Sequence, residues 1–425
     1  MYLADRAAPA RANTAPDGVR RPVRRVSQVV LALGAVSLIT DVSSEMVTAV
    51  LPLYLVVSLG LSPLGFGALD GVYNGVSALV QLTGGHLADR VRDHKLIAGL
   101  GYGLSALCKP LLLLVQSLGP LGVVLALERT GKGLRTSPRD ALISLSTPAE
   151  HRGRAFGVHR AMDTTGAVLG PITAFLILRA ATDGYHAVFG VSACVAVLGV
   201  LVLVLFVPGK RQLAAEGIGG AADAPGSRPV NLREAAALLR LPRLRALTGC
   251  AVLLGLTTVS DAFVYLLLQH RAHIGEEWFP LMPLGTASVF LLLAVPAGVL
   301  ADRVGRRAVF LAGHAGLLAG YALLLWAPAT PALPYLVLGL HGLFYAATDG
   351  VLPAAVSDVV PEELRGSGLA LVGTGQALAR FCCSLAFGAA WTVWGDTRAL
   401  FGSAIGLLLC ALVAGLVLRP AGGRR

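Results

Sequence analysis

Twelve long apolar runs, separated by short polar segments, make up most of this chain. An apolar run of about 18 or more residues can cross the hydrocarbon core of a bilayer as a helix, and no strand-like alternation competes with these runs. The pattern therefore predicts an all-α polytopic membrane protein. The predicted spans are 27–57, 65–88, 95–117, 121–145, 153–180, 187–208, 243–269, 279–301, 308–327, 333–356, 367–393 and 397–418.

Basic residues gather in every second segment between these runs, which indicates the orientation. Short loops rich in Arg and Lys stay on the cytoplasmic side of a membrane. With twelve spans, all basic clusters fall on the same side as both termini, whereas an odd number would place one cluster outside. We therefore expect a multi-pass protein of the bacterial plasma (inner) membrane with both termini in the cytoplasm. The clusters lie at 90–95, 152–154, 210–245, 303–307, 365 and 419–425.

The composition agrees with burial in lipid. Of the 425 residues, 14% are charged, against about 25% in soluble proteins. In a soluble protein, a net charge of +11 would indicate nucleic acid as a partner. Here the basic residues lie in loops, so we expect the lipid bilayer as partner and no nucleic acid. The cysteines and histidines lack metal-ligand spacing, and we find no catalytic constellation. We therefore expect no metal, no cofactor and no enzymatic activity.

A short motif that occurs twice indicates an internal duplication. Gly85–Arg90 and Gly298–Arg303 share the pattern Gly-x-Leu-Ala-Asp-Arg, and Asp302 follows Asp89 by 213 residues (302 minus 89). The pair Glu363 and Arg365 follows the pair Glu150 and Arg152 at the same offset. A constant offset over roughly sixty residues indicates two related halves. We expect bundles at 27–208 and 243–418, a cytoplasmic linker at 209–242, a disordered cytoplasmic tail at 1–26 and a second cytoplasmic tail at 419–425.

At these residues the chain resembles the major facilitator superfamily. Both copies of the motif are similar to that family's signature loop, which joins the second and third spans and again the eighth and ninth. The second copy continues through Gly305 as in the family, whereas the first has Arg92 in place of the usual glycine and Asp93 in place of a basic residue. The resemblance implies a twelve-helix fold of two pseudo-symmetric six-helix bundles that rock about a central cavity.

The resemblance also implies that these loops form cytoplasmic gating contacts in one conformational state only. A carboxylate near a helix N-terminus is stabilised by the helix dipole and by a neighbouring Arg. The expected gating residues are Gly85, Asp89, Arg90, Glu150, Arg152, Gly298, Asp302, Arg303, Glu363 and Arg365.

The span at 121–145 carries a charged stripe. Glu128, Lys132, Arg135 and Arg139 follow one another at helical spacing and so share one face. A basic residue at the bilayer centre costs about 2.5–3.5 kcal/mol, so these side chains must face water or carboxylates. Two compatible interpretations follow: a hydrated cavity lined by cations, or a salt-bridge network that holds this span to its neighbours at 27–57 and 153–180.

Asp41 and Glu45 lie four residues apart in the first span and at a similar depth. Burial favours the neutral form of a carboxyl and neighbouring cations favour its charged form, so a carboxylate balanced between them can exchange a proton. We expect Asp41, Glu45, Glu128 and Arg129 to carry proton coupling; the alternative is permanent pairing of the two acids with Arg129 or Lys132. Asp70 is a weaker candidate. The expected substrate-cavity residues are Lys132, Arg135, Arg139, Asp163, Asp261, His341 and Asp349, with Arg380 nearby.

Two further resemblances concern the coupling class. The run Arg129-x-x-Lys132-Gly133 resembles a signature of proton-coupled facilitators, although Lys132 replaces the usual Gln. The glycines Gly157, Gly166 and Gly170, followed by Pro171, resemble an antiporter signature whose closing glycine pair is replaced here by Ala174 and Phe175. Small residues four apart also let two helices approach closely, and Pro171 permits a bend.

Together these features predict a secondary active transporter of the bacterial drug:proton antiporter type, which exports a small organic molecule by alternating access as a monomer. An alternative, proton-coupled uptake or exchange of an organic anion, is motivated by Lys132, Arg135 and Arg139. A remote alternative is a non-transporting membrane receptor or scaffold. The expected partners are the small-molecule substrate, the proton and the bilayer; the residue pattern does not name the substrate.

Overall fold

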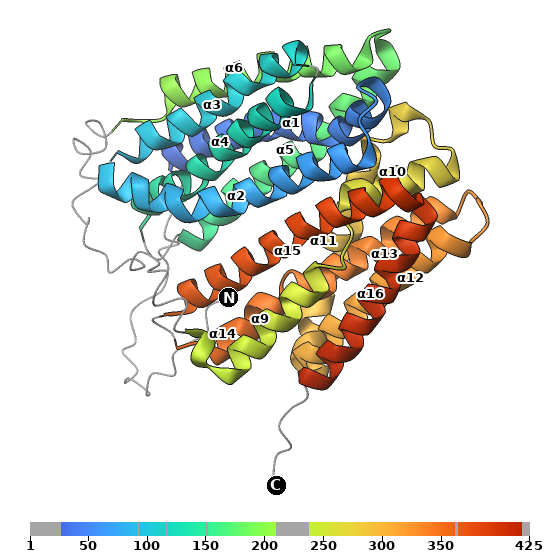
Figure 1. The fold of residues 1–425 in the computed structure, drawn as a ribbon. Helices are drawn as coiled ribbons and strands as arrows, with labels where there is room; N and C mark the ends of the chain where they lie inside the picture. The colour runs from blue at the N-terminus through green and yellow to red at the C-terminus, as the bar shows by residue number, and fades with distance from the viewer. Residues whose placement is uncertain are drawn as a thin grey trace, which may run out of the picture.

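The computed structural model describes residues 27–91, 93–115, 117–148, 152–209, 238–361 and 364–418. Every regular element in these ranges is a helix, as Figure 1 shows. The elements are α1 (Gln28–Leu53), the π-helical turn η1 (Tyr54–Ser58), α2 (Pro63–Val91), α3 (His94–Leu114), α4 (Leu118–Leu145), α5 (Arg152–Ala180), α6 (Gly184–Phe206), η3 (Leu238–Arg240), α9 (Pro242–Gly255), α10 (Asp261–Ala272), η4 (Glu276–Trp278), α11 (Leu281–Val304), α12 (Arg306–Trp326), α13 (Leu333–Thr348), α14 (Val351–Val359), α15 (Arg365–Trp394) and α16 (Asp396–Val417).

Each predicted span corresponds to a helix or to a broken pair of helices. The span predicted at 243–269 is interrupted between α9 and α10, and the span predicted at 333–356 is interrupted between α13 and α14. Within the described ranges, nine segments are long and apolar enough to cross a membrane. The helix α4 is not among them because of its charged stripe, and α9 and α10 are individually too short.

The helices form two bundles, one from α1–α6 and one from α9–α16 (Figure 1). In the first bundle α1 packs on α5 and α6, and α4 packs on α2 and α3. In the second, α13 packs on α11 and α12, and α16 packs on α12. This is the two-bundle helical fold that the sequence predicts. The expected tails and most of the expected linker (1–26, 210–237 and 419–425) lie outside the described residues.

Glycines bring α1 and α5 into backbone contact. A Cβ atom at Gly166 would lie 2.5 Å from the Leu38 carbonyl oxygen, and one at Gly170 would lie 2.8 Å from the Glu45 Cβ. Gly157 differs, because nothing lies within 4 Å of its Cβ position. Two of the three motif glycines, Gly166 and Gly170, therefore have a packing role: they hold α1, which carries Asp41 and Glu45, against α5.

The bundles meet at the ends remote from the basic loops. The first turns of α2 contact the last turns of α15: Leu64 N donates to Thr392 Oγ1 at 3.0 Å, and Gly71 packs on the Phe381 ring. At the same ends Tyr185 on α6 donates to Glu276 in η4 at 2.9 Å. The structure is therefore closed on this side of the cavity.

The expected gating residues whose backbone the structure describes lie at the other end. Gly85, Asp89 and Arg90 fall in the last turns of α2, but their side chains lie outside the described residues, as do Glu150, Glu363 and the Arg365 side chain. Arg152 donates to the Thr147 carbonyl at 3.4 Å. Gly298 and Arg303 lie in α11, and Asp302 is 4.0 Å from Arg306. Their gating role stays a prediction.

Candidate substrate cavity and its charged wall

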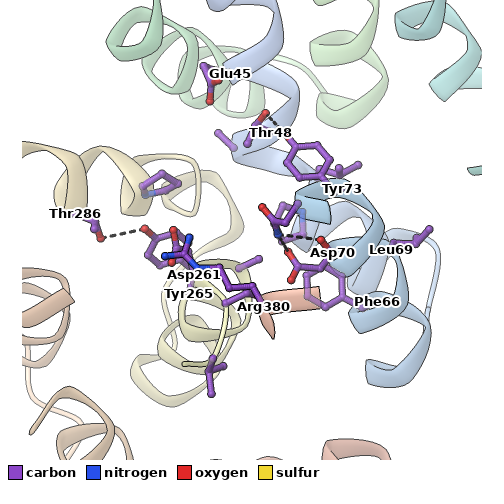
Figure 2. Close-up of a pocket in the computed structure, with 18 of the residues that line it drawn as sticks. Glu45, Thr48, Phe66, Leu69, Asp70, Tyr73, Asp261, Tyr265, Thr286 and Arg380 are labelled. Carbon is purple, nitrogen blue, oxygen red and sulfur yellow. Dashed lines mark hydrogen bonds between the residues drawn. The ribbon is translucent and has the colours of Figure 1, made fainter. Parts of the chain in front are cut away.

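A cavity of about 400 Å³ lies between the two bundles. The wall from the first bundle comes from α1, α2 and α4, and the opposite wall from α10, α11, α13 and α15, together with the segment before α10 (Figure 2). Aromatic side chains supply much of the lining: Phe66, Tyr73, Tyr265, Phe279, Phe290 and Tyr345. Its acidic and basic side chains are Glu45, Asp70, Asp261, Asp349 and Arg380.

The break between α9 and α10 places Asp261 at the cavity. Residues 256–260 leave the helical path, and the Val259 amide donates to the Tyr321 hydroxyl at 2.8 Å instead of to a helical carbonyl. Ser260 is the N-cap residue of α10, so Asp261 occupies its first turn, where the helix dipole stabilises a carboxylate. The apolar period predicts a continuous span here, and the local signal for the break is the run Thr257–Asp261.

Asp261 is the centre of a hydrogen-bonded cluster in the second bundle. His341 Nε2 donates to its Oδ1 at 3.0 Å, and the Tyr345 hydroxyl donates to the same oxygen at 2.6 Å. Arg380 lies beside Asp261 in Figure 2. Its guanidinium interacts electrostatically with Asp261 and Asp349, although no ion pair within 4.0 Å joins it to a described side chain. The positive charge of Arg380 is thus attracted to two carboxylates, Asp261 and Asp349.

On the opposite wall, Glu45 pairs with Lys132. Lys132 Nζ donates to Glu45 Oε1 at 3.1 Å, and the two side chains are 29% and 26% exposed, so this pair is accessible from the cavity. Beside it the Thr48 and Tyr73 hydroxyls are 2.6 Å apart. The Arg129 guanidinium stacks on the Tyr73 ring at 3.4 Å, which is a cation–π geometry.

Behind this wall lies a buried network of ion pairs. Arg135 donates to Asp41 at 3.2 Å. Glu128 lies between Lys109 Nζ, at 3.2 Å, and Arg129 Nε, at 3.0 Å.

Arg139 completes this network towards α5. It contacts Asp140 at 3.1 Å and Asp163 at 3.4 Å. The α4 cations are therefore all matched by carboxylates, as a buried charge requires.

The predicted site residues thus fall into two layers. Glu45, Asp261 and Asp349 line the cavity, and Lys132 and His341 contact a lining carboxylate. The others, Asp41, Glu128, Arg129, Arg135, Arg139 and Asp163, lie in the network behind it. Their roles in coupling and substrate binding stay predictions. Lys109 was not singled out from the sequence, although it is the one charged residue within the apolar run 96–117.

A two-bundle helical membrane protein with a cavity between its halves has the architecture of an alternating-access transporter. The family model described as Major Facilitator Superfamily matches residues 33–291 and 279–425. An uncharacterised MFS-type transporter of Methanocaldococcus jannaschii is 30% identical over 406 residues, covering 93% of this chain and 95% of the relative. The chain therefore belongs to the Major Facilitator Superfamily and is a multi-pass membrane transporter.

Other similarities are more distant. The inner membrane transport protein YajR of Escherichia coli is 25% identical over 358 residues, covering 81% of this chain and 73% of the relative. The crystal structure of the nucleoside transporter NupG superposes with a TM-score of 0.76 at 13% identity, covering 93% of this chain and 100% of that one. An inward-facing bacterial homologue of the human lysosomal transporter Spinster gives 0.73 at 15% identity, covering 94% and 98%. At these identities the structural matches show the fold alone.

Proposed function

We propose that this transporter exports a small organic cation in exchange for protons, as a monomer in the plasma membrane with its basic loops in the cytoplasm. The observation that carries the proposal is the charge of the cavity lining, which contains four carboxylates and one arginine. The aromatic lining adds apolar area and ring faces that attract cations. A flat organic cation fits both properties, and the structure, closed on the side remote from the basic loops, would receive it from the cytoplasm.

Glu45 is the proposed site of proton exchange. Its carboxylate faces the cavity, and among the described cations Lys132 is the one within 4.0 Å of it, while Arg129 attracts it from farther away. An arriving cation competes with Lys132 for the charged carboxylate, whereas a proton removes the charge for which they compete. Substrate and proton therefore exclude each other at this group, which is the requirement for exchange. Asp41 is a less suitable site, because its carboxylate is buried against Arg135.

The organic-anion alternative receives less support. That alternative was based on the cations of the charged stripe, but Lys132, Arg135 and Arg139 each contact a carboxylate in the structure. Arg380 is the cation that lines the cavity, and two carboxylates share its field. An anion would have to displace these carboxylates, whereas a cation meets them directly.

The test uses purified protein in liposomes that contain a pH-sensitive dye. Under an imposed proton gradient, ethidium or tetraphenylphosphonium should drive proton movement opposite to its own, and Glu45→Gln should abolish that movement. Glu277→Gln, a matched change in η4 outside the cavity lining, should retain it. Proton movement in the same direction as an added organic anion would reverse the proposal, and cation flux without proton movement would remove the coupling role of Glu45.

A further inference from the structure

Asp70 on α2 has a different environment from the other cavity carboxylates. Glu45 is paired with Lys132, and Asp261 and Asp349 share the field of Arg380. Asp70 is held by neutral donors: Ser384 Oγ donates to its Oδ2 at 2.6 Å, and Asn74 Nδ2 donates to its Oδ1 at 3.2 Å. Among the described residues, no cation lies within ion-pair distance of it. It is therefore the cavity carboxylate best able to accept a cationic ligand.

The hydrogen bond from Ser384 also joins the two bundles. Asp70 belongs to the first bundle and Ser384, on α15, to the second. Around this bond the helices touch backbone to backbone, because Gly67 faces the Ser384 carbonyl and Gly388 faces the Pro63 carbonyl. The bond lies at the inner edge of the closed side, and Asp70 also lines the cavity. The Asp70 carboxylate thus lines the cavity and also takes part in the α2–α15 contact that closes the cavity.

Alternating access requires α2 and α15 to separate on this side, which removes Ser384 from Asp70. Asp70 then keeps the Asn74 amide on its Oδ1 but loses the shorter hydrogen bond to its Oδ2, and an unpaired carboxylate oxygen in an apolar wall is unfavourable. An ammonium or related cation at Asp70 would replace the lost donor with a stronger partner. Separation is then unfavourable for the empty transporter and permitted for the loaded one.

From this geometry we infer that Asp70 binds the positive group of the substrate and that this contact releases the α2–α15 gate. The inference rests on the proposed cation transport and adds the group that senses the cargo. The Asp70 carboxylate changes partner in each cycle: the cation replaces the Ser384 hydroxyl, and the hydroxyl donates to the carboxylate again when the substrate leaves. Glu45 stays the group at which proton and substrate compete, and Asp70 is the group that senses the bound cation at the gate, so the two roles can be tested with separate variants.

Binding is tested first, with ethidium, a flat cation that carries amino donors, on the purified full chain and no proton gradient. Asp70→Asn is nearly isosteric and still accepts from Ser384, so the fold should persist while affinity falls at least tenfold, the effect of losing one charge-assisted contact. The matched control is Asp183→Asn, a carboxylate that pairs with His186 outside the cavity lining and should leave affinity unchanged. Equal affinity in Asp70→Asn and wild type would overturn the inference but leave the proposed function standing.

Gate opening is measured separately, by disulfide formation between Leu64→Cys and Thr392→Cys in a cysteine-free background. These positions are adjacent across the gate, since the Leu64 amide and the Thr392 hydroxyl are 3.0 Å apart. The cation should slow cross-linking several-fold with Asp70 present and have no effect in Asp70→Asn. Ser384→Ala should slow cross-linking without ligand yet retain cation binding. A cation effect that persists in Asp70→Asn overturns the inference; failure of wild type to bind any cation overturns the proposed function as well.

Discussion

Asp41 on α1 and Arg135 on α4 form a buried ion pair, with 3.2 Å between Oδ1 and Nη2. Their side chains are 12% and 3% exposed. Arg135 also lies over the Tyr102 ring of α3, 4.6 Å from its centroid. The guanidinium therefore connects three helices of the first bundle through a single group.

Removing one member of this pair should destabilise the fold. Arg135→Met leaves Asp41 charged and without its partner, and we expect a loss of about 3–5 kcal/mol in the free energy of unfolding. The double variant Asp41→Leu/Arg135→Met should recover most of it, because no charge remains uncompensated. Thermal unfolding in detergent measures both. A single variant as stable as wild type would mean that the pair does not hold α1 to α4.

The close approach of α1 and α5 gives a second prediction, with a control in the same motif. Gly166→Leu should destabilise the protein by about 1–3 kcal/mol or prevent folding, because its side chain would overlap the Leu38 backbone. Gly157→Ala should be neutral or slightly stabilising, since nothing lies within 4 Å and alanine favours helices. Thermal unfolding midpoints show whether Gly166 is needed for packing or only for transport. Equal midpoints for Gly166→Leu and wild type would exclude the packing role of Gly166.

Gly305 joins α11 to α12 with a φ angle of +97°, which only glycine adopts readily. Gly305→Ala should lower stability by about 1–2 kcal/mol. Gly298→Ala, in an ordinary helical position with open space around it, should not. Chemical unfolding of both variants provides the measurement. If Gly305→Ala matches Gly298→Ala, this turn does not require the positive φ angle.

The outer contact between Tyr185 and Glu276 should influence the conformational equilibrium more than folding. Tyr185→Phe removes one hydrogen bond to a carboxylate, worth about 1 kcal/mol at an exposed site, so the outward-open population should rise up to about fivefold. Fluorescence energy transfer between probes on the two bundles reports the shift. Tyr335→Phe, at an exposed tyrosine on α13, is the control. An unchanged equilibrium in Tyr185→Phe would exclude this contact from the gate.

Much of the fold follows from apolar run length alone, because a bilayer imposes one requirement on every span. The interruptions at Leu256–Ser260 and Asp349–Gly350 did not follow from run length, because apolar residues continue on both sides of each. At the first, the Val259 amide bonds to the distant Tyr321 hydroxyl and not to a helical carbonyl. A tertiary hydrogen bond of this kind leaves no periodic trace in the sequence.

The charged candidates were visible in the sequence, but their partners were not. Glu45 and Lys132 form one of the pairings that the sequence left open as the alternative to proton coupling, whereas Asp41 pairs with Arg135 and Glu128 pairs with Lys109 of α3. Several acids and bases at similar depth have many possible matchings. The distances between helices, set in part by Gly166 and Gly170, decide among them.

The ion pairs of α4 all remain inside one bundle, with partners on α1, α3, α4 and α5. When two bundles rock as rigid bodies, the buried pairs move as a unit and need not be broken or rehydrated in any turnover. The partly exposed Glu45–Lys132 pair is the exception in the proposed mechanism, because proton and substrate compete for that carboxylate. The buried charges therefore form a rigid framework for the first bundle, and their number does not add to the free-energy cost of a transport cycle. In the proposed mechanism the contacts that change are the Glu45–Lys132 pair and a few contacts where the bundles meet, such as Asp70–Ser384.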